Sequence, residues 1–146
     1  MSGSGIQSHA ASQLPVSSYF DQALYEREMQ AIFGKMPRYV GHELCVPHEG
    51  HYHTLQQEGG GRALLRTARG IELISNVCRH RQAIMLKERG VQKGQIVCPL
   101  HRWTYDISGK EQAAGQLIGA PHFEKDPCLH LNNYALQSWN GLLFDV

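Results

Sequence analysis

Two cysteine–histidine pairs are the residues whose types and spacing most clearly suggest chemistry. Cys78 and His80 are separated by one residue, and Cys98 and His101 follow after a gap of 17 residues. Thiolate sulfur and imidazole nitrogen are common side-chain ligands of zinc and iron in proteins. The spacing therefore predicts a metal site that is assembled from two short loops of the folded chain.

Two kinds of metal centre use two cysteines and two histidines. Zinc fingers usually take a cysteine pair from one element and a histidine pair from another, whereas each loop here contributes one of each. In a [2Fe-2S] cluster of mixed ligation, two thiolates bind one iron and two imidazoles bind the other. With two ferric irons that cluster has no formal net charge, so it accepts an electron more readily than an all-cysteine cluster. We expect the cluster, and a structural zinc site is the weaker alternative.

The sequence around the pairs resembles a known protein family. The segment NVCRHRQA, residues 76–83, is followed by CPLHRWTYDISGK, residues 98–110. Together they are similar to the Rieske domain of the α subunit of ring-hydroxylating, non-haem iron oxygenases, and the similarity extends over residues 19–146. The resemblance implies a Rieske-type [2Fe-2S] cluster on the four residues named above, and transfer of single electrons to a mononuclear iron.

The resemblance also implies partners for the electron transfer. The donor would be a reductase or a ferredoxin, and the acceptor the catalytic domain or a neighbouring α subunit of a homotrimer. The chain carries neither the family's mononuclear iron site nor the acidic residue that bridges the two metal centres, so alone it is not expected to activate oxygen. A stand-alone Rieske ferredoxin is the alternative, although such ferredoxins generally begin directly with strands. Aromatic-ring hydroxylation by the associated oxygenase rests on family analogy alone.

Residues beside the pairs predict a reduction potential near the low end of the Rieske range. High-potential Rieske proteins join their two loops by a disulfide, but the corresponding positions here are Ala83 and Leu100. Trp103 stands where those proteins carry a serine that donates to a cluster sulfur, while Tyr105 keeps a hydroxyl that could donate. Fewer hydrogen bonds to sulfur leave the added negative charge less stabilised.

Three arginines flank the two histidines of the motif. Arg79, Arg81 and Arg102 would form either a basic collar around the cluster or ordinary solvated surface charge. A collar would favour an acidic redox partner. Arg102 replaces the glycine that the family usually places after the second histidine.

A second group of histidines lies upstream and resembles an iron site only superficially. His48 and His53 lie near Glu49, and two histidines with a carboxylate form the catalytic iron site of this family. That histidine pair lies on a helix, however, and Pro47 and Gly50 would break a helix here. We expect these histidines to be strand and turn residues.

The elements that position the motif are predicted to be short strands. After Pro37, β-favouring runs alternate with glycine-rich or polar turns, which predicts an all-β fold, an antiparallel sandwich or barrel, and not βαβ units. With the two cluster-binding loops, this is the Rieske iron–sulfur fold. The predicted strand segments are residues 39–45, 51–55, 62–67, 71–77, 94–98, 133–139 and 142–146.

Upstream of the strands, the sequence predicts a leader and one α-helix. Residues 1–15 are small and polar and are expected to be disordered. Residues 20–33 have apolar side chains at helical spacing, with Ser18 and Asp21, three residues on, as the predicted capping pair and Gly34 as the stop. We expect a packing helix within a single Rieske domain that spans residues 16–146.

Composition excludes several other classes of protein. The 146 residues are 42% hydrophobic and 18% charged with a formal net charge of +1, which is typical of one globular domain and gives no case for nucleic-acid binding. The sequence has neither a run long enough to span a bilayer nor a signal peptide, so we expect a cytoplasmic protein.

Cys45 and Cys128 lack a nearby histidine at ligand spacing and are expected to be small buried apolar residues.

Overall fold

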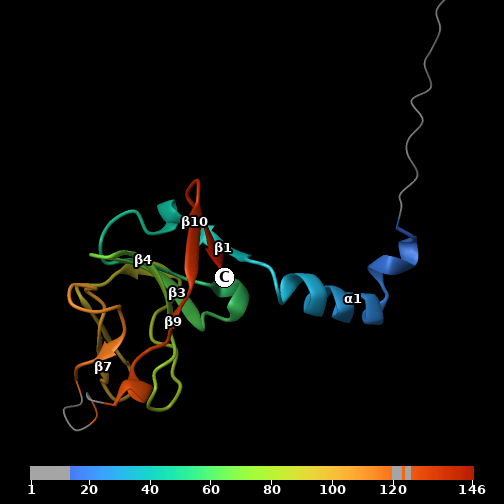
Figure 1. Cartoon of the computed structure of the whole chain (residues 1–146). Coiled ribbons are helices and arrows are strands. Elements are labelled where there is room, and N and C mark those ends of the chain that lie inside the picture. The colour runs from blue at the N-terminus through green and yellow to red at the C-terminus, as the bar shows by residue number, and fades with distance from the viewer. Residues whose placement is uncertain (1–13, 120–122, 124–125) are drawn as a thin grey trace, which may run out of the picture. The chain divides into compact units, whose positions relative to one another are not determined.

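A computed structural model describes residues 14–119, 123 and 126–146 of the chain (Figure 1). The chain divides into two compact units, Met1–Met36 and Pro37–Val146. Residues 1–13 of the predicted leader lie outside the described part. The interpretation of residues 16–146 as one domain stays a prediction.

The first unit is helical. A 3₁₀ turn, η1 (Val16–Tyr19), precedes α1 (Gln22–Glu28), which continues as the π-helical segment η2 (Met29–Phe33). The helix predicted over 20–33 is therefore present from residue 22, with its start two residues later than expected.

The cap of the helix differs from the prediction. The carboxylate of Asp21 accepts a hydrogen bond from the Leu24 amide at 3.0 Å, as an N-cap residue does. Ser18 instead donates its hydroxyl to the carbonyl of Pro15. The Gly34 amide donates to the Met29 carbonyl at 2.7 Å and ends the helix, as predicted.

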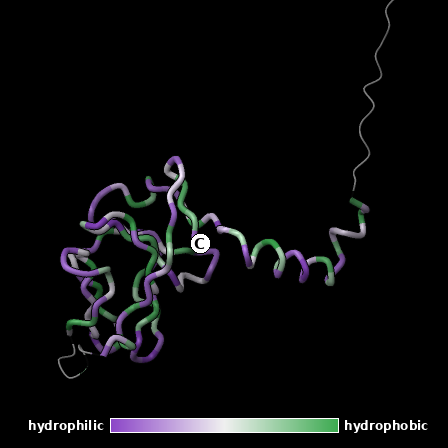
Figure 2. The backbone as a smooth tube through the Cα atoms, in the orientation of Figure 1, coloured by the Kyte–Doolittle hydropathy of each residue, from purple (hydrophilic) through white to green (hydrophobic). Residues whose placement is uncertain are grey.

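The predicted packing face of this helix is not buried. None of the described residues of the first unit is buried, and Tyr25, Met29, Ile32 and Phe33 all have exposed side chains. Figure 2 shows hydrophobic residues interleaved with hydrophilic ones along this segment. The first unit therefore has no apolar core of its own among its described residues.

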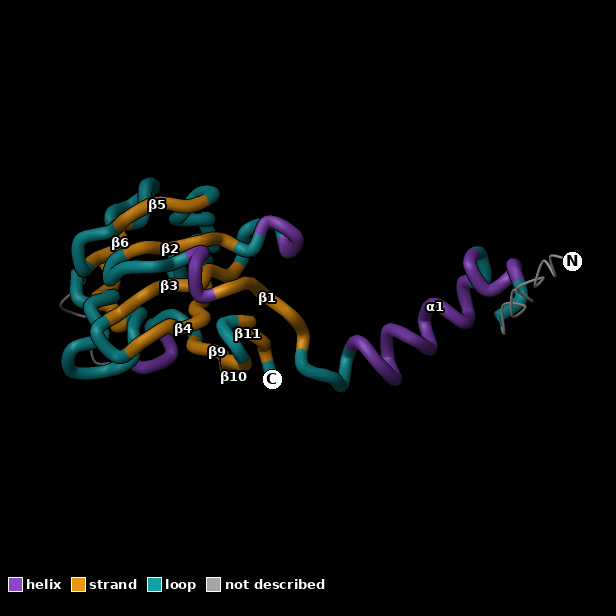
Figure 3. The backbone as a smooth tube through the Cα atoms, turned by 90° about the horizontal axis from the view of Figure 1, so that it is seen from above, coloured by secondary structure: helices purple, strands orange, loops and turns teal. Residues whose placement is uncertain are grey.

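The second unit is built from antiparallel sheets, which confirms the predicted fold class. A five-stranded sheet has the order β5-β2-β3-β4-β9, and two three-stranded sheets have the orders β1-β11-β10 and β6-β7-β8 (Figure 3). The described strands are β1 (Arg38–His42), β2 (His51–Thr54), β3 (Arg62–Thr67), β4 (Gly70–Ser75), β5 (Arg89–Val91), β6 (Gln95–Val97), β7 (Thr104–Asp106), β8 (Gln116–Leu117), β9 (Asn133–Tyr134), β10 (Leu136–Trp139) and β11 (Leu142–Asp145).

The central strand β3 is buried on both faces. Ala63 and Leu65 pack into one apolar cluster together with residues of the two predicted loops, and Leu64 packs into a second cluster with Leu143 of β11. Successive strand residues point to opposite faces, so three consecutive buried residues require cover on both sides of the sheet. The first cluster is the one that underlies the candidate site.

Several strand ends differ from the prediction for local reasons. The first strand ends at His42, because its Nδ1 accepts a hydrogen bond from the Leu44 amide and the chain turns into η3 (Glu43–Cys45). Strands β5 and β8 have three and two residues, which is too short for an alternating pattern. The predicted turn between β10 and β11 is present, with φ of 48° at Asn140 and 82° at Gly141, as a type I′ hairpin turn requires.

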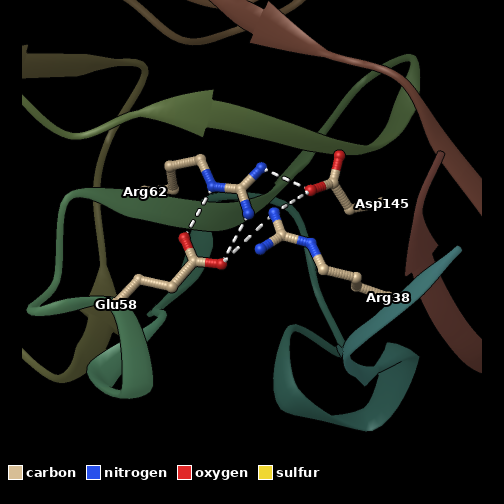
Figure 4. Close-up of polar contacts among 4 residues, drawn as sticks. All are labelled: Arg38, Glu58, Arg62 and Asp145. Atoms are coloured by element: carbon tan, nitrogen blue, oxygen red, sulfur yellow. Dashed lines mark hydrogen bonds and ion pairs between the residues drawn. The ribbon is translucent and has the colours of Figure 1, made fainter. Parts of the chain in front are cut away.

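An ion cluster connects the last strand to the central sheet (Figure 4). Arg62 of β3 donates to both carboxylate oxygens of Glu58 and, at 2.8 Å, to Asp145 of β11. Arg38 of β1 also donates to Asp145, at 2.7 Å. The hydrogen bond from Arg62 lowers the pKa of Glu58 despite burial. Burial opposes ionisation of Asp145 as well, but the bonds from Arg38 and Arg62 lower its pKa overall.

Among the described residues, none of the helices has the length and apolar character needed to cross a membrane.

Candidate metal centre

The first predicted loop begins directly after β4 and is closed by its own backbone. The Cys78 amide donates to the Ala83 carbonyl at 2.9 Å, and the Gln82 amide donates to the Cys78 carbonyl at 2.9 Å. Gln82 has a φ of 55°, in the left-handed region that few residues other than glycine adopt readily. The turn places Cys78 at its base and His80 at its tip.

The second loop repeats this backbone turn between β6 and β7. The Cys98 amide donates to the Trp103 carbonyl at 2.8 Å, and the Arg102 amide donates to the Cys98 carbonyl at 3.0 Å. Arg102 has a φ of 60°, like its counterpart in the first loop. This conformation explains why a glycine suits this position, and it shows that the arginine is held under backbone strain.

A buried asparagine, which was missed in the sequence, anchors the first loop. Asn76 is fully buried and its amide nitrogen donates to the carbonyls of Gly60 and Leu86, both at 2.8 Å. Its amide oxygen accepts a hydrogen bond from the Leu86 amide, also at 2.8 Å. These bonds tie both ends of the loop to the adjacent chain. In the sequence, the only sign of this role is a polar residue two positions before Cys78.

The four predicted ligands are divided by exposure into two pairs. Cys78 and Cys98 are each only 1% exposed and belong to the first apolar cluster. His80 and His101 are exposed, and their ring centroids lie 4.6 Å apart with an interplanar angle of 79°. The two loops thus present paired sulfurs inside and paired imidazoles outside.

This donor set fits a binuclear cluster. Across residues 14–119, 123 and 126–146, no three histidine, cysteine or acidic side chains are gathered to hold one ion, and this includes the four predicted ligands. A structural zinc ion takes four ligands around one point, whereas mixed-ligand [2Fe-2S] clusters need only two protein ligands on each iron. Two buried cysteines and two exposed histidines, whose rings are in contact, are the donor types that such a cluster uses.

Tyr105 of β7 contacts the first loop from the buried side. Its hydroxyl lies 3.4 Å from Cys78 Sγ and accepts a hydrogen bond from the Arg79 amide at 3.0 Å. Burial raises the pKa of Tyr105 above its ordinary value, and the bond to Cys78 and the charges of Cys78 and Cys98 raise it further. The phenol therefore keeps its proton, which is free to point at the sulfur.

Trp103 contacts His80, the histidine of the first loop. Its half-buried indole stacks on the His80 imidazole, with ring centroids 4.9 Å apart and an interplanar angle of 14°. It also stacks against Phe123, with ring centroids 5.9 Å apart. Trp103 and Tyr105 both lie at the end of the second loop or in the strand after it. Their side chains contact His80, Cys78 and Arg79, so this part of the chain supports the first loop.

The three arginines of the predicted collar lie at the solvent side of the loops. Arg79, Arg81 and Arg102 are all exposed. The guanidinium of Arg79 donates to the carbonyl of Cys128 at 3.1 Å, so one of the three is held close to the protein surface.

The upstream histidines are strand and turn residues in the structure. His51 and His53 belong to β2, and the ring of His48 meets that of His51 edge-on at 5.3 Å. His42 caps η3 through its ring nitrogen. No third ligand joins them among the described residues.

The prediction for the remaining cysteines was wrong. Cys128 is exposed and Cys45 is only partly buried. Cys128 lies in η5 (Pro127–Leu129), where its amide is capped by the Asp126 carboxylate. Short 3₁₀ turns lie at the surface in this fold, and the sequence around Cys128 gives no periodic pattern that would reveal this.

Comparison with known proteins identifies relatives of the chain. Residues 37–134 match the protein family described as the Rieske [2Fe-2S] domain. The putrescine 2-hydroxylase of Ralstonia nicotianae is 60% identical over 133 residues, which cover 91% of this chain and 34% of that protein. The putrescine 2-hydroxylase of Bordetella bronchiseptica is 49% identical over 150 residues, which cover 93% and 34%.

Solved structures agree with this result. Naphthalene 1,2-dioxygenase from a Rhodococcus species, bound to indole, matches with a TM-score of 0.64 and 26% identity, over 86% of this chain and 29% of that chain. The chain thus spans about a third of the length of the curated relatives it matches, at 34% of each.

Proposed function

The chain belongs to the Rieske [2Fe-2S] domain family, and we propose that it binds the family's cluster through Cys78, His80, Cys98 and His101. The observation that carries this assignment is the repeated backbone turn, which buries both cysteines and exposes both histidines. The bound cluster supplies a site that takes up and releases one electron.

The residues around the cluster have separate tasks in this proposal. With Cys78 as a thiolate ligand, the Tyr105 hydroxyl is the donor of their hydrogen bond, so it stabilises negative charge on the sulfur. The apolar cluster around both cysteines keeps water from the sulfur side. The exposed imidazoles are the edge that a redox partner can approach.

Reconstitution of the full chain tests the ligand assignment. Iron and sulfide should give a coloured protein whose reduced form has the electron paramagnetic resonance (EPR) signal of a cluster with two imidazole ligands. Cys98→Ala and His80→Ala should each abolish that signal. Cys128→Ala and His48→Ala change the same residue types at exposed positions outside the loops, and should retain it. An EPR signal that survives in Cys98→Ala or His80→Ala, or a colourless protein that contains zinc, would refute the assignment.

We infer further that this domain delivers electrons to an oxygenase and is not a free ferredoxin. The match to a putrescine 2-hydroxylase covers 91% of this chain, which includes most of the helical unit that precedes the strands. In that role a reductase or ferredoxin is the donor, and the acceptor is a mononuclear iron in a catalytic domain or a neighbouring subunit. Assembly of such subunits into a homotrimer is part of the same proposal.

The substrate class we propose for that oxygenase is a small aliphatic diamine. Two relatives at 60% and 49% identity are named putrescine 2-hydroxylases, whereas the similarity to naphthalene dioxygenase is 26%. The test is oxygen uptake by the holoenzyme with putrescine and, separately, with naphthalene. Hydroxylation of putrescine alone supports the proposal, and turnover of naphthalene alone refutes it.

The exposed arginines support an acidic surface on the electron donor. Arg79, Arg81 and Arg102 flank the exposed imidazoles, and such charges raise association rates at low ionic strength. Replacing Arg79 and Arg81 by glutamine should slow reduction by the donor at low salt, with little effect at high salt. Arg69→Gln, at an exposed turn between β3 and β4, is the matched control. Equal rates at low salt would remove the proposed docking role.

A further inference from the structure

His80 is held differently from His101, although the two loops have the same backbone turn. Its imidazole lies parallel to the indole of Trp103, with a centroid separation of 4.9 Å, and also meets the ring of His101 edge-on. His101 has only that one ring contact among the described residues. The pair is therefore asymmetric.

The His80 imidazole lies against two other rings. Histidines that bind metals usually have their second ring nitrogen held by a hydrogen bond, which sets the plane of the ring. Within the described residues, the His80 imidazole makes no hydrogen bond to protein, and its ring contacts are with Trp103 and His101. A metal–nitrogen bond by itself leaves the imidazole free to rotate about that bond.

Trp103 lies where it can restrict this rotation of the His80 imidazole. Its carbonyl closes the second loop by accepting the Cys98 amide, and its side chain packs against the first apolar cluster. The indole is thus fixed by one loop while its face contacts the histidine of the other. Stacked aromatic rings attract each other beyond simple burial, and they do so only in a limited range of orientations.

We propose that Trp103 is a positioning residue that fixes the plane of the His80 imidazole at the cluster, across the gap between the two loops. The inference rests on the proposed ligand role of His80. Trp103 does this through the stacking of its indole on the imidazole face.

Four variants of the full chain, loaded with its cluster, test the proposal. Trp103→Phe keeps an aromatic face, whereas Trp103→Leu removes it and keeps an apolar side chain. Trp103→Met is the replacement if the leucine variant takes up no cluster. Trp139→Leu, at the other tryptophan of the chain, which is 65% exposed on β10, is the matched control.

Two measurements distinguish positioning from ordinary packing. Pulsed EPR of the reduced protein measures the couplings of the two bound imidazole nitrogens, and these depend on ring orientation. We expect Trp103→Leu to broaden the coupling of one nitrogen and leave the other unchanged. We also expect it to speed cluster loss to a chelator roughly three- to tenfold, the range that a lost stacking contact gives.

Trp103→Phe should restore most of both properties, and Trp139→Leu should match the wild-type protein. Equal nitrogen couplings in the leucine and wild-type proteins would overturn the proposal, and so would an identical change in the leucine and phenylalanine variants. If the wild-type protein itself shows no pair of nitrogen ligands, the ligand assignment fails, and this outcome is distinct from failure of the role of Trp103.

Discussion

At the scale of single residues, the chemistry of the loops depends on which side chains are buried. The sulfurs of the motif lie in an apolar cluster and the imidazoles lie in solvent, although both residue types occur in each loop. The short turn explains this division, because its base is tied to the sheet and its tip projects away from it. Tyr105 and Asn76 then set the buried side of the site through hydrogen bonds.

Tyr105→Phe should lower the reduction potential without loss of the cluster. The variant removes the O–H that points at Cys78 Sγ, so the reduced, more negative cluster loses more stabilisation than the oxidised one. The expected decrease is roughly 20–60 mV, the equivalent of one ordinary hydrogen bond for a one-electron couple. Protein-film voltammetry measures it, with Tyr39→Phe on β1 as the control. An unchanged potential would show that the hydroxyl does not act on the cluster.

Arg102→Gly should stabilise the protein. Arg102 has a φ of 60°, where glycine has no steric cost and other residues are strained. After the greater entropy of an unfolded glycine is subtracted, we expect a gain of up to about 1 kcal/mol in the free energy of unfolding. Urea denaturation measures this gain. Arg102→Ala removes the same charge but keeps the strain, so a similar gain in that variant would contradict the backbone explanation.

At the scale of elements, the C-terminal strand is held by charge as well as by sheet pairing. Strand β11 lies between β1 and β10, and its Asp145 accepts hydrogen bonds from Arg38 and Arg62. Arg62 also lies over the ring of Tyr134 on β9, with 4.9 Å from its guanidinium carbon to the ring centroid. One half-buried arginine therefore joins strands of two different sheets.

This ion cluster should make the fold sensitive to acid. The pKa values of Glu58 and Asp145 are lowered in the folded protein, so both carboxylates stabilise the fold above their ordinary pKa values. That contribution is lost as pH falls through the lowered, folded-state pKa values, which lie below the ordinary values of about 4. Asp145→Asn should therefore cost on the order of 1–3 kcal/mol at pH 7 and less at pH 3, which is below the ordinary pKa of the carboxyl group.

Unfolding by urea at the two pH values measures the effect of Asp145→Asn. The exposed Glu111 provides the control variant, Glu111→Gln, which should be close to wild type at both. A cost for Asp145→Asn that is equal at pH 7 and pH 3 would rule out an ionic contribution.

At the scale of the whole molecule, both loops, both apolar clusters and all three sheets belong to the second unit. The family match over residues 37–134 lies within this unit as well. The helical unit has its own cap and helix end, and none of its described residues is buried. All four predicted ligand residues therefore belong to the second unit.

Residues 37–146 should fold and take up the cluster without residues 1–36. The free energy of unfolding should stay within about 1 kcal/mol of the full chain, because both apolar clusters and all three sheets lie within residues 37–146. The EPR signal of the reduced cluster and the urea midpoint are the measurements. A shortened chain that binds no cluster would show that the helical unit contributes to the site.

The sequence by itself determined the ligand set to be tested, the β class of the fold, and several turns. These features are local: two donors within four residues, alternation along a strand, and an Asn–Gly pair that can adopt positive φ at Asn140 and Gly141. The two-residue strand β8 and the exposure of Cys128 have no comparable local signal. They depend on which distant segments lie beside them.

Only the tertiary structure decided how the two loops contact each other. The stacking of Trp103 on His80 and the contact of Tyr105 with Cys78 join residues 23 and 27 positions apart. Such contacts arise from strand pairing and from the shared apolar cluster, and no periodicity along the chain encodes them. The same holds for Asp145, whose charge partners lie 83 and 107 residues away.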